Sequence, residues 1–138
     1  SDGGAEIQVP ERKKDITRDP KAFAARVRHE LHALVRALAA HDYEEAVASV
    51  HPESPLDGAQ ISSAMERYYE EYPSLVIDQR ARTTDRTMLE KVEPYLYRVR
   101  HVLVDPEQDN LWFVEGELDL RDDPAPEGVL LRLERIGS

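Results

Sequence analysis

The chain has 138 residues, a formal net charge of −10 and no cysteine. This length predicts one domain, and the absence of cysteine excludes disulfides, thiol nucleophiles and thiolate zinc sites. No apolar run approaches the roughly 20 residues that a membrane span needs, so we expect a protein of the reducing cytoplasm that does not bind membranes.

Residues 1–18 predict a flexible tail or linker, because they show no apolar periodicity. A single domain then spans residues 19–138. Asp19 followed by Pro20 favours the start of a helix. Apolar side chains recur after it at helical steps of three and four, which predicts a helix of about 20 residues with one apolar stripe. The stripe consists of Phe23, Val27, Leu31, Leu34, Val35 and Leu38.

Two shorter helices are expected next. His41 and Asp42 interrupt the first helix, and Asp42 is a suitable cap for a short second one. Asp57 caps a third helix that continues to Tyr72, where Pro73 prevents its extension.

The periodicity changes to alternation after residue 74, which is typical of strands. We expect about four antiparallel strands, at residues 75–82, 95–103, 112–121 and 129–136, with a loop up to Pro94 and a turn at residues 105–110. Three helices followed by these strands predict an α+β fold, with the helices packed on one face of a curved antiparallel sheet.

This order of elements resembles the cone-shaped, cystatin-like fold of the SnoaL, ketosteroid isomerase and nuclear-transport-factor-like group. Residues 34–46 and 57–75 carry the resemblance. It implies an open cone in which an interior group transfers protons. One hypothesis is therefore a domain that binds or isomerises a small molecule, with His101 as the acid or base and Tyr97 beside it.

A closer resemblance covers most of residues 19–137. These residues are similar to the uncharacterised C-terminal domain of certain bacterial DEAD/DEAH-box helicases of superfamily 2. The matching segments are residues 19–20, 26–43, 68–71, 98–106, 109–112, 115–120 and 131–137. The resemblance implies an ATPase motor upstream in the same chain, which would be the natural partner and would alone hold ATP and magnesium. The sequence has no phosphate-binding G-x-x-x-x-G-K-[ST] loop, so we expect no enzymatic activity of this fragment.

His101 is the strongest catalytic candidate among the residues themselves. It shares the alternation of Val99 and Leu103, so it is expected on the inner side of the sheet, where burial shifts a histidine pKa. The alternative interpretation is a structural histidine bonded to its surroundings. Under the leading hypothesis no residue is catalytic.

Charged residues alternate along the strands in a pattern typical of a solvated face. Glu115, Glu117 and Asp119 lie opposite the apolar side of their strand, and we expect them to face arginines across the sheet. Nucleic-acid binding would require the strand arginines to form one continuous stripe. Given the acidic net charge, we expect no strong autonomous binding of nucleic acid. The strand arginines are Arg98, Arg100, Arg132 and Arg135.

Two groups of potential metal ligands are weak. His29 and His32 are three residues apart on one helix but have no carboxylate at a matching position. Asp105, Glu107 and Asp109 resemble the start of a calcium loop that lacks its glycine and its distal glutamate. We therefore expect no metal or other cofactor in this fragment.

Four aromatic residues are candidates for contact with a partner. Tyr68, Tyr69 and Tyr72 lie near the end of the third helix, and exposed aromatics of this kind favour protein contact. Trp112 begins a strand and fits either core packing or a contact surface. The leading hypothesis is an accessory, non-catalytic domain of a helicase that works through contact with the motor, a second copy of this chain or another protein.

Overall fold

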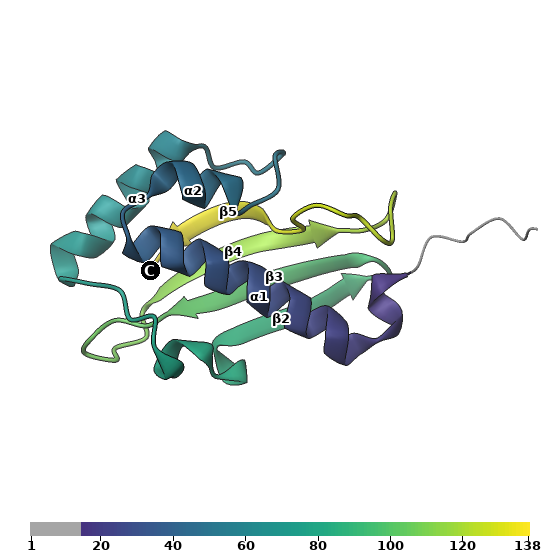
Figure 1. Cartoon of the computed structure of the whole chain (residues 1–138), viewed down its shortest axis with the longest axis horizontal. Coiled ribbons are helices and arrows are strands. Elements are labelled where there is room, and N and C mark those ends of the chain that lie inside the picture. The colour runs from purple at the N-terminus through teal and green to yellow at the C-terminus, as the bar shows by residue number, and fades with distance from the viewer. Residues whose placement is uncertain (1–14) are drawn as a thin grey trace, which may run out of the picture.

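The computed structural model describes residues 15–138 and has an α+β architecture in which the helices precede the sheet (Figure 1). The elements are η1 (Ile16–Arg18), α1 (Pro20–Ala39), α2 (Tyr43–Ala48), α3 (Gly58–Glu71), η2 (Gln79–Arg82), η3 (Thr84–Arg86), β2 (Thr87–Glu93), β3 (Leu96–Leu103), β4 (Trp112–Asp119) and β5 (Arg132–Gly137). Most of the expected tail, residues 1–14, lies outside the described residues. Its last part is ordered as η1, where the Ile16 N–H donates to the Pro124 carbonyl at 3.0 Å.

Each α-helix begins at an aspartate whose side chain accepts a hydrogen bond from the first turn, as the sequence predicts. Asp19 accepts from the Ala22 N–H at 3.1 Å, and Asp42 caps α2 in the same way. At α3 the cap is a reciprocal capping box between Asp57 and Gln60. These bonds satisfy backbone donors that the helix itself leaves unpaired.

The four strands form one antiparallel sheet in the order β2-β3-β4-β5, so β2 and β5 are its edges. Side chains alternate between a buried and a solvated face along each central strand. On β3 the buried residues are Val99, His101 and Leu103. α1 crosses the buried face diagonally, and α3 lies beside β5 (Figure 1). The core fills the space between α1, α3 and the sheet.

The expected strand at residues 75–82 is wrong, and β2 takes its place in the sheet. The Asp78 carboxylate accepts from the Arg80 N–H at 2.9 Å, which starts the 3-10 helix η2 instead of a strand. β2 lies in the segment that was expected to be a loop. It pairs with β3 from Thr87 opposite His101. The sheet still has four strands, as expected, because β2 stands in place of the strand expected at residues 75–82.

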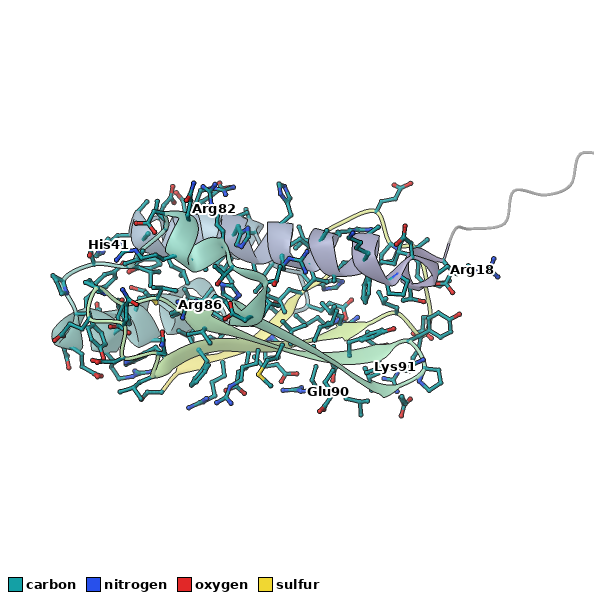
Figure 2. The ribbon with its side chains drawn as sticks, turned by 90° about the horizontal axis from the view of Figure 1, so that it is seen from below. Arg18, His41, Arg82, Arg86, Glu90 and Lys91 are labelled. Atoms are coloured by element: carbon teal, nitrogen blue, oxygen red, sulfur yellow. The ribbon has the colours of Figure 1, made fainter. Side chains whose placement is uncertain are left out.

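The outer face of the sheet carries no helix within residues 15–138. Figure 2 shows the helices on one side of the sheet and only side chains on the other, among them Glu90. Met88 and Val92 of β2 are exposed apolar side chains. Among the described residues, no helix is long and apolar enough to cross a membrane.

Candidate functional site

His101 lies on the inner face of β3, under α1, and its side chain is 1% exposed. Its Nδ1 is 2.8 Å from the Thr87 hydroxyl on the neighbouring strand. The His32 ring of α1 stands edge-on to it, with the ring centroids 6.1 Å apart. The residue is on the expected side of the sheet, enclosed between helix and sheet.

Burial lowers the pKa of His101 from its ordinary value of 6.5 to about 4, and the nearby His32 and Arg86 contribute in the same direction. The ring is therefore neutral at neutral pH. A proton-transfer residue needs contact with its substrate, and this ring has almost no contact with solvent. The geometry fits a histidine that packs and bonds to Thr87.

Tyr97 does not support His101 chemically. It lies four residues along β3, which is about 13 Å at the usual rise of a strand. Its ring packs edge-on against Phe23 of α1, with centroids 5.0 Å apart. Tyr97 and His101 lie on the same side of β3, as the sequence predicts, but they are too far apart along the strand to act together.

The acidic residues of β4 lie on the outer face of the sheet and pair with arginines, as expected. Arg98 is 3.8 Å from Glu117 and 2.8 Å from Glu134, while Arg100 is 3.6 Å from Glu115. The arginines of β5 are also paired: Arg135 with Glu115 at 2.8 Å and Arg132 with Glu53 at 3.7 Å. These arginines are dispersed among carboxylates, so they form no continuous basic stripe.

The expected exposed aromatic patch on α3 does not form. Tyr68 and Tyr72 are 0% and 4% exposed, because the stripe they share is the face that packs on the sheet. Their hydroxyls donate to the Ser74 carbonyl and to Asp109 Oδ2, both at 2.7 Å. Tyr69 is half-buried and donates to the Leu38 carbonyl at 2.9 Å. These side chains join α3 to its neighbours and leave little aromatic surface for a partner.

The potential metal ligands also have structural roles. Asp105 is 1% exposed, and its two oxygens accept from the backbone N–H groups of Asp109 and Asn110 at 3.0 Å. This bonding shapes the turn between β3 and β4. Within residues 15–138, no group of three or more metal-ligating side chains is placed to hold an ion.

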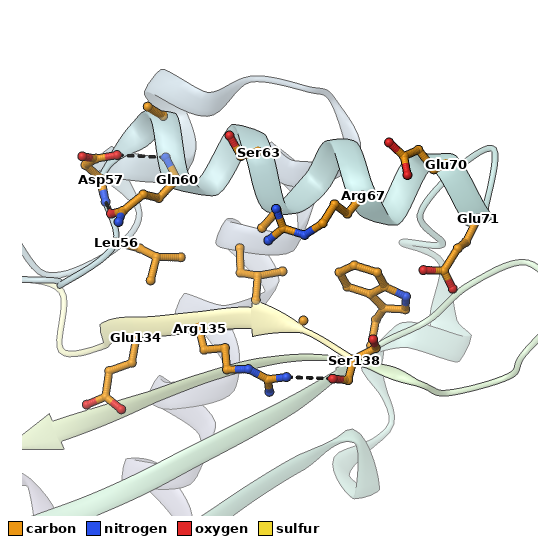
Figure 3. A pocket seen from close by; sticks show the side chains of 15 residues that line it. Leu56, Asp57, Gln60, Ser63, Arg67, Glu70, Glu71, Glu134, Arg135 and Ser138 are labelled. Carbon is orange, nitrogen blue, oxygen red and sulfur yellow. Dashed lines mark hydrogen bonds between the residues drawn. The ribbon is translucent and has the colours of Figure 1, made fainter.

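An open groove of about 790 Å³ lies between α3 and the edge strand β5 (Figure 3). Leu56, Ala64 and Ile136 give it an apolar floor. Arg67 extends from α3 into the groove toward β5, and within residues 15–138 it has no ion pair or hydrogen bond. The rim carries both signs of charge, with Glu70 and Glu71 on the helix and Glu134 and Arg135 on the strand.

Trp112 contributes an unsatisfied hydrogen-bond donor to this groove. Its side chain is 3% exposed and lines the groove, and its Nε1–H has no hydrogen-bond partner among the described residues. Leaving a buried donor unpaired costs about 1–3 kcal/mol. The wall of the groove thus contains a buried polar atom without an acceptor, and a bound acceptor reaches it only when the side chains that cover Nε1 move aside.

The edge of β5 that faces the groove is only partly covered. The Leu131 and Leu133 carbonyls accept from the backbone N–H groups of His51 and Leu56, at 2.7 and 3.2 Å. Beyond Leu133, this edge of β5 forms no backbone hydrogen bond to a segment outside the sheet within residues 15–138. Trp112 was expected as a contact residue or a core residue, whereas no motif in the sequence points to Arg67.

Comparison with protein families gives a match that covers nearly the whole chain. The family described as Domain of unknown function (DUF3516) matches residues 2–136. A search of curated proteins found no match. By its sequence, the chain belongs to the DUF3516 family.

Proposed function

We propose that this chain is a non-catalytic accessory domain of a bacterial DEAD/DEAH-box helicase, that it works in the cytoplasm, and that it acts by binding its motor through the α3–β5 groove. The observation that carries the proposal is the combination, in one groove, of the unpartnered Trp112 Nε1–H and the open end of β5. The choice of partner rests on the resemblance of residues 19–137 to the helicase domain.

The groove favours an extended peptide segment as the occupant. A strand added to a sheet edge gains backbone hydrogen bonds, and side-chain pockets beside the edge give specificity. Residues 134–137 supply the free edge, and the groove next to them holds apolar and charged side chains of both signs. Arg67, which has no acidic partner in the part of the chain that the structure describes, favours a segment that carries a carboxylate.

The enclosed position of His101 argues for contact rather than catalysis as the role of this domain. Its 1% exposure and its bond to Thr87 leave no approach for a substrate in this conformation. The paired arginines on the outer face of the sheet likewise favour a protein partner over nucleic acid.

Calorimetric titration of the 138-residue chain with the separately produced motor segment of its parent protein tests the proposal. We expect saturable one-to-one binding that weakens at least about tenfold in Arg67→Glu and in Ser63→Arg, which place a repulsive charge and a bulky side chain in the groove. Arg18→Glu, a charge reversal in η1 outside the groove, is the matched control and should bind as the wild type does.

Three results would contradict the proposal. The first is no binding of the motor segment, and the second is binding that the groove variants leave unchanged. The third is submicromolar affinity of the isolated chain for RNA or DNA at moderate salt. Sedimentation of the chain alone identifies self-association, and a dimer that closes the groove would replace the motor as the occupant.

A further inference from the structure

Four arginines gather where α1 meets η2 and η3, on the opposite side of α1 from the α3–β5 groove. We call them the arginine cluster: Arg28, Arg36, Arg82 and Arg86. Arg28 and Arg36 lie one helical turn on either side of His32. Burial is the main cause of the lowered pKa of His32, and the charges of the arginines of α1 and η2 lower it further. Arg86 acts in the same way on His101, so the charges of the cluster act on one small region.

The arginine cluster is not neutralised within residues 15–138. Arg28, Arg36 and Arg82 form no ion pair or hydrogen bond there. Arg86 donates to the Asn110 side-chain oxygen at 2.8 Å and to the Arg80 carbonyl at 3.2 Å, both uncharged.

The carboxylates nearest to the cluster do not change this. Asp78 feels the charge of Arg82, but its hydrogen bonds and its ion pair, at 2.8 Å, are with Arg80. Asp85 feels the charge of Arg86, but its own bond is to Thr83. The arginines of the outer sheet face, by contrast, are each paired with a glutamate. The chain has an excess of carboxylates, with a net charge of −10, yet none of them forms an ion pair with the cluster within residues 15–138. The cluster therefore indicates a site for an external anion.

A small cavity lies at the cluster, and its lining combines two arginines and a histidine with three apolar side chains. The lining residues are His32, Val35, Arg36, Ile77, Ala81 and Arg82. Its volume of about 10 Å³ accommodates roughly one atom of oxygen size. Ile77 beside it is 43% exposed, which gives a ligand an apolar surface to rest on.

We propose that the arginine cluster binds a phosphate monoester, with one phosphoryl oxygen in the cavity between Arg36 and Arg82 and the organic part of the ligand against Ile77. Planar guanidinium groups bind phosphate with paired hydrogen bonds, which suits two arginines that converge from different elements. A single phosphate group fits better than a nucleic-acid backbone, because the negative charge of the whole chain repels a long polyanion.

The test is a titration of the isotope-labelled 138-residue chain, followed by backbone ¹⁵N–¹H NMR. The probes are adenosine monophosphate, inorganic phosphate, adenosine and a short oligouridine. We expect the binding of adenosine monophosphate to reach saturation and to shift the resonances of residues 28–36 and 77–86. Inorganic phosphate should shift the same resonances with weaker affinity, and adenosine should shift none. The first two probes distinguish an ester from the free ion.

Variants localise the binding. Arg82→Gln and Arg36→Gln should each weaken the affinity for adenosine monophosphate at least about tenfold, because each removes a charged donor. Arg18→Gln is the matched control, since Arg18 is an exposed arginine at the other end of the molecule from Arg82 (Figure 2). The control should leave the affinity unchanged. All three side chains are exposed, so the folded spectra should be retained.

The inference is overturned if adenosine monophosphate does not saturate, or if Arg82→Gln and Arg36→Gln bind it as the wild type does. It is also overturned if oligouridine binds more tightly than adenosine monophosphate with an affinity that falls steeply with salt, because the cluster would then be a nucleic-acid site. None of these results bears on the α3–β5 groove, which contains no member of the cluster.

Discussion

Gly116 shows how closely two strands can constrain a single residue. A β-carbon on Gly116 would collide with the backbone oxygen of Arg132 and lie 2.7 Å from Leu131 Cδ1. Gly116→Ala should therefore lower the free energy of unfolding by about 1–3 kcal/mol, because β5 must shift to make room. Urea denaturation measures this. Gly128→Ala, where the added carbon meets nothing within 4 Å, should stay within about 0.5 kcal/mol of wild type, and equal losses in both variants would contradict the packing described here.

His101 should make the stability of the domain depend on pH. Its pKa is 6.5 when unfolded and about 4 when folded, so between these values the unfolded chain binds the additional proton. The free energy of unfolding should fall by up to about 3 kcal/mol as the pH decreases from 6.5 to 4. Burial also lowers the pKa of His32 and acts with the same sign.

Denaturation at pH 7 and at pH 5.5 measures this effect, because few carboxylates titrate in that interval. His101→Gln, which cannot take up the proton, should lose most of the difference between the two pH values. His29→Gln replaces an exposed histidine of α1 and should keep the difference. A His101→Gln variant with the full pH dependence would show that the buried ring is not its source.

Among the elements, α1 is linked by the Glu30 side chain to the two residues that precede β5. Glu30 Oε1 accepts from the backbone N–H groups of Leu130 and Leu131, at 2.9 and 3.3 Å. Glu30→Ala would leave both donors unpaired beside the core, so we expect a loss of about 1–3 kcal/mol in the free energy of unfolding. Glu66→Ala, at an exposed position of α3, is the control and should change it by less than about 0.5 kcal/mol. Similar values for the two variants would mean that the link carries no stability.

The helices could be predicted closely because their signals are local. An aspartate at each start and apolar residues at helical spacing define α1 and α3 without reference to the rest of the chain. The first strand could not be predicted. Residues 75–82 alternate as a strand does, but the hydrogen bond that Asp78 accepts from the Arg80 N–H turns the chain into a 3-10 helix. β2 itself has exposed Met88 and Val92 on its outer side, which obscures its alternation.

The sequence predicts which face of the sheet single residues lie on. It does not reveal the α3–β5 groove or the arginine cluster. The solvated acids of β4 follow from alternation along one strand. The α3–β5 groove joins Arg67 to residues of β5 that are about seventy positions away in sequence, and the arginine cluster joins α1 to η2 in the same manner. Such sets appear only when the register and the packing are known. The inner position of Trp112 could be predicted, because it shares the alternation of Val114 and Leu118 along its strand.

The proposed contact site lies at an open edge of the sheet. The interior between the helices and the sheet is filled by the core. Trp112 is the only tryptophan of the chain, so its indole N–H gives a single NMR signal from within the groove. Addition of the motor segment to the labelled chain should shift that signal downfield as Nε1–H acquires an acceptor. An unchanged indole signal at saturating motor segment, or the absence of any binding, would contradict the role proposed for this domain.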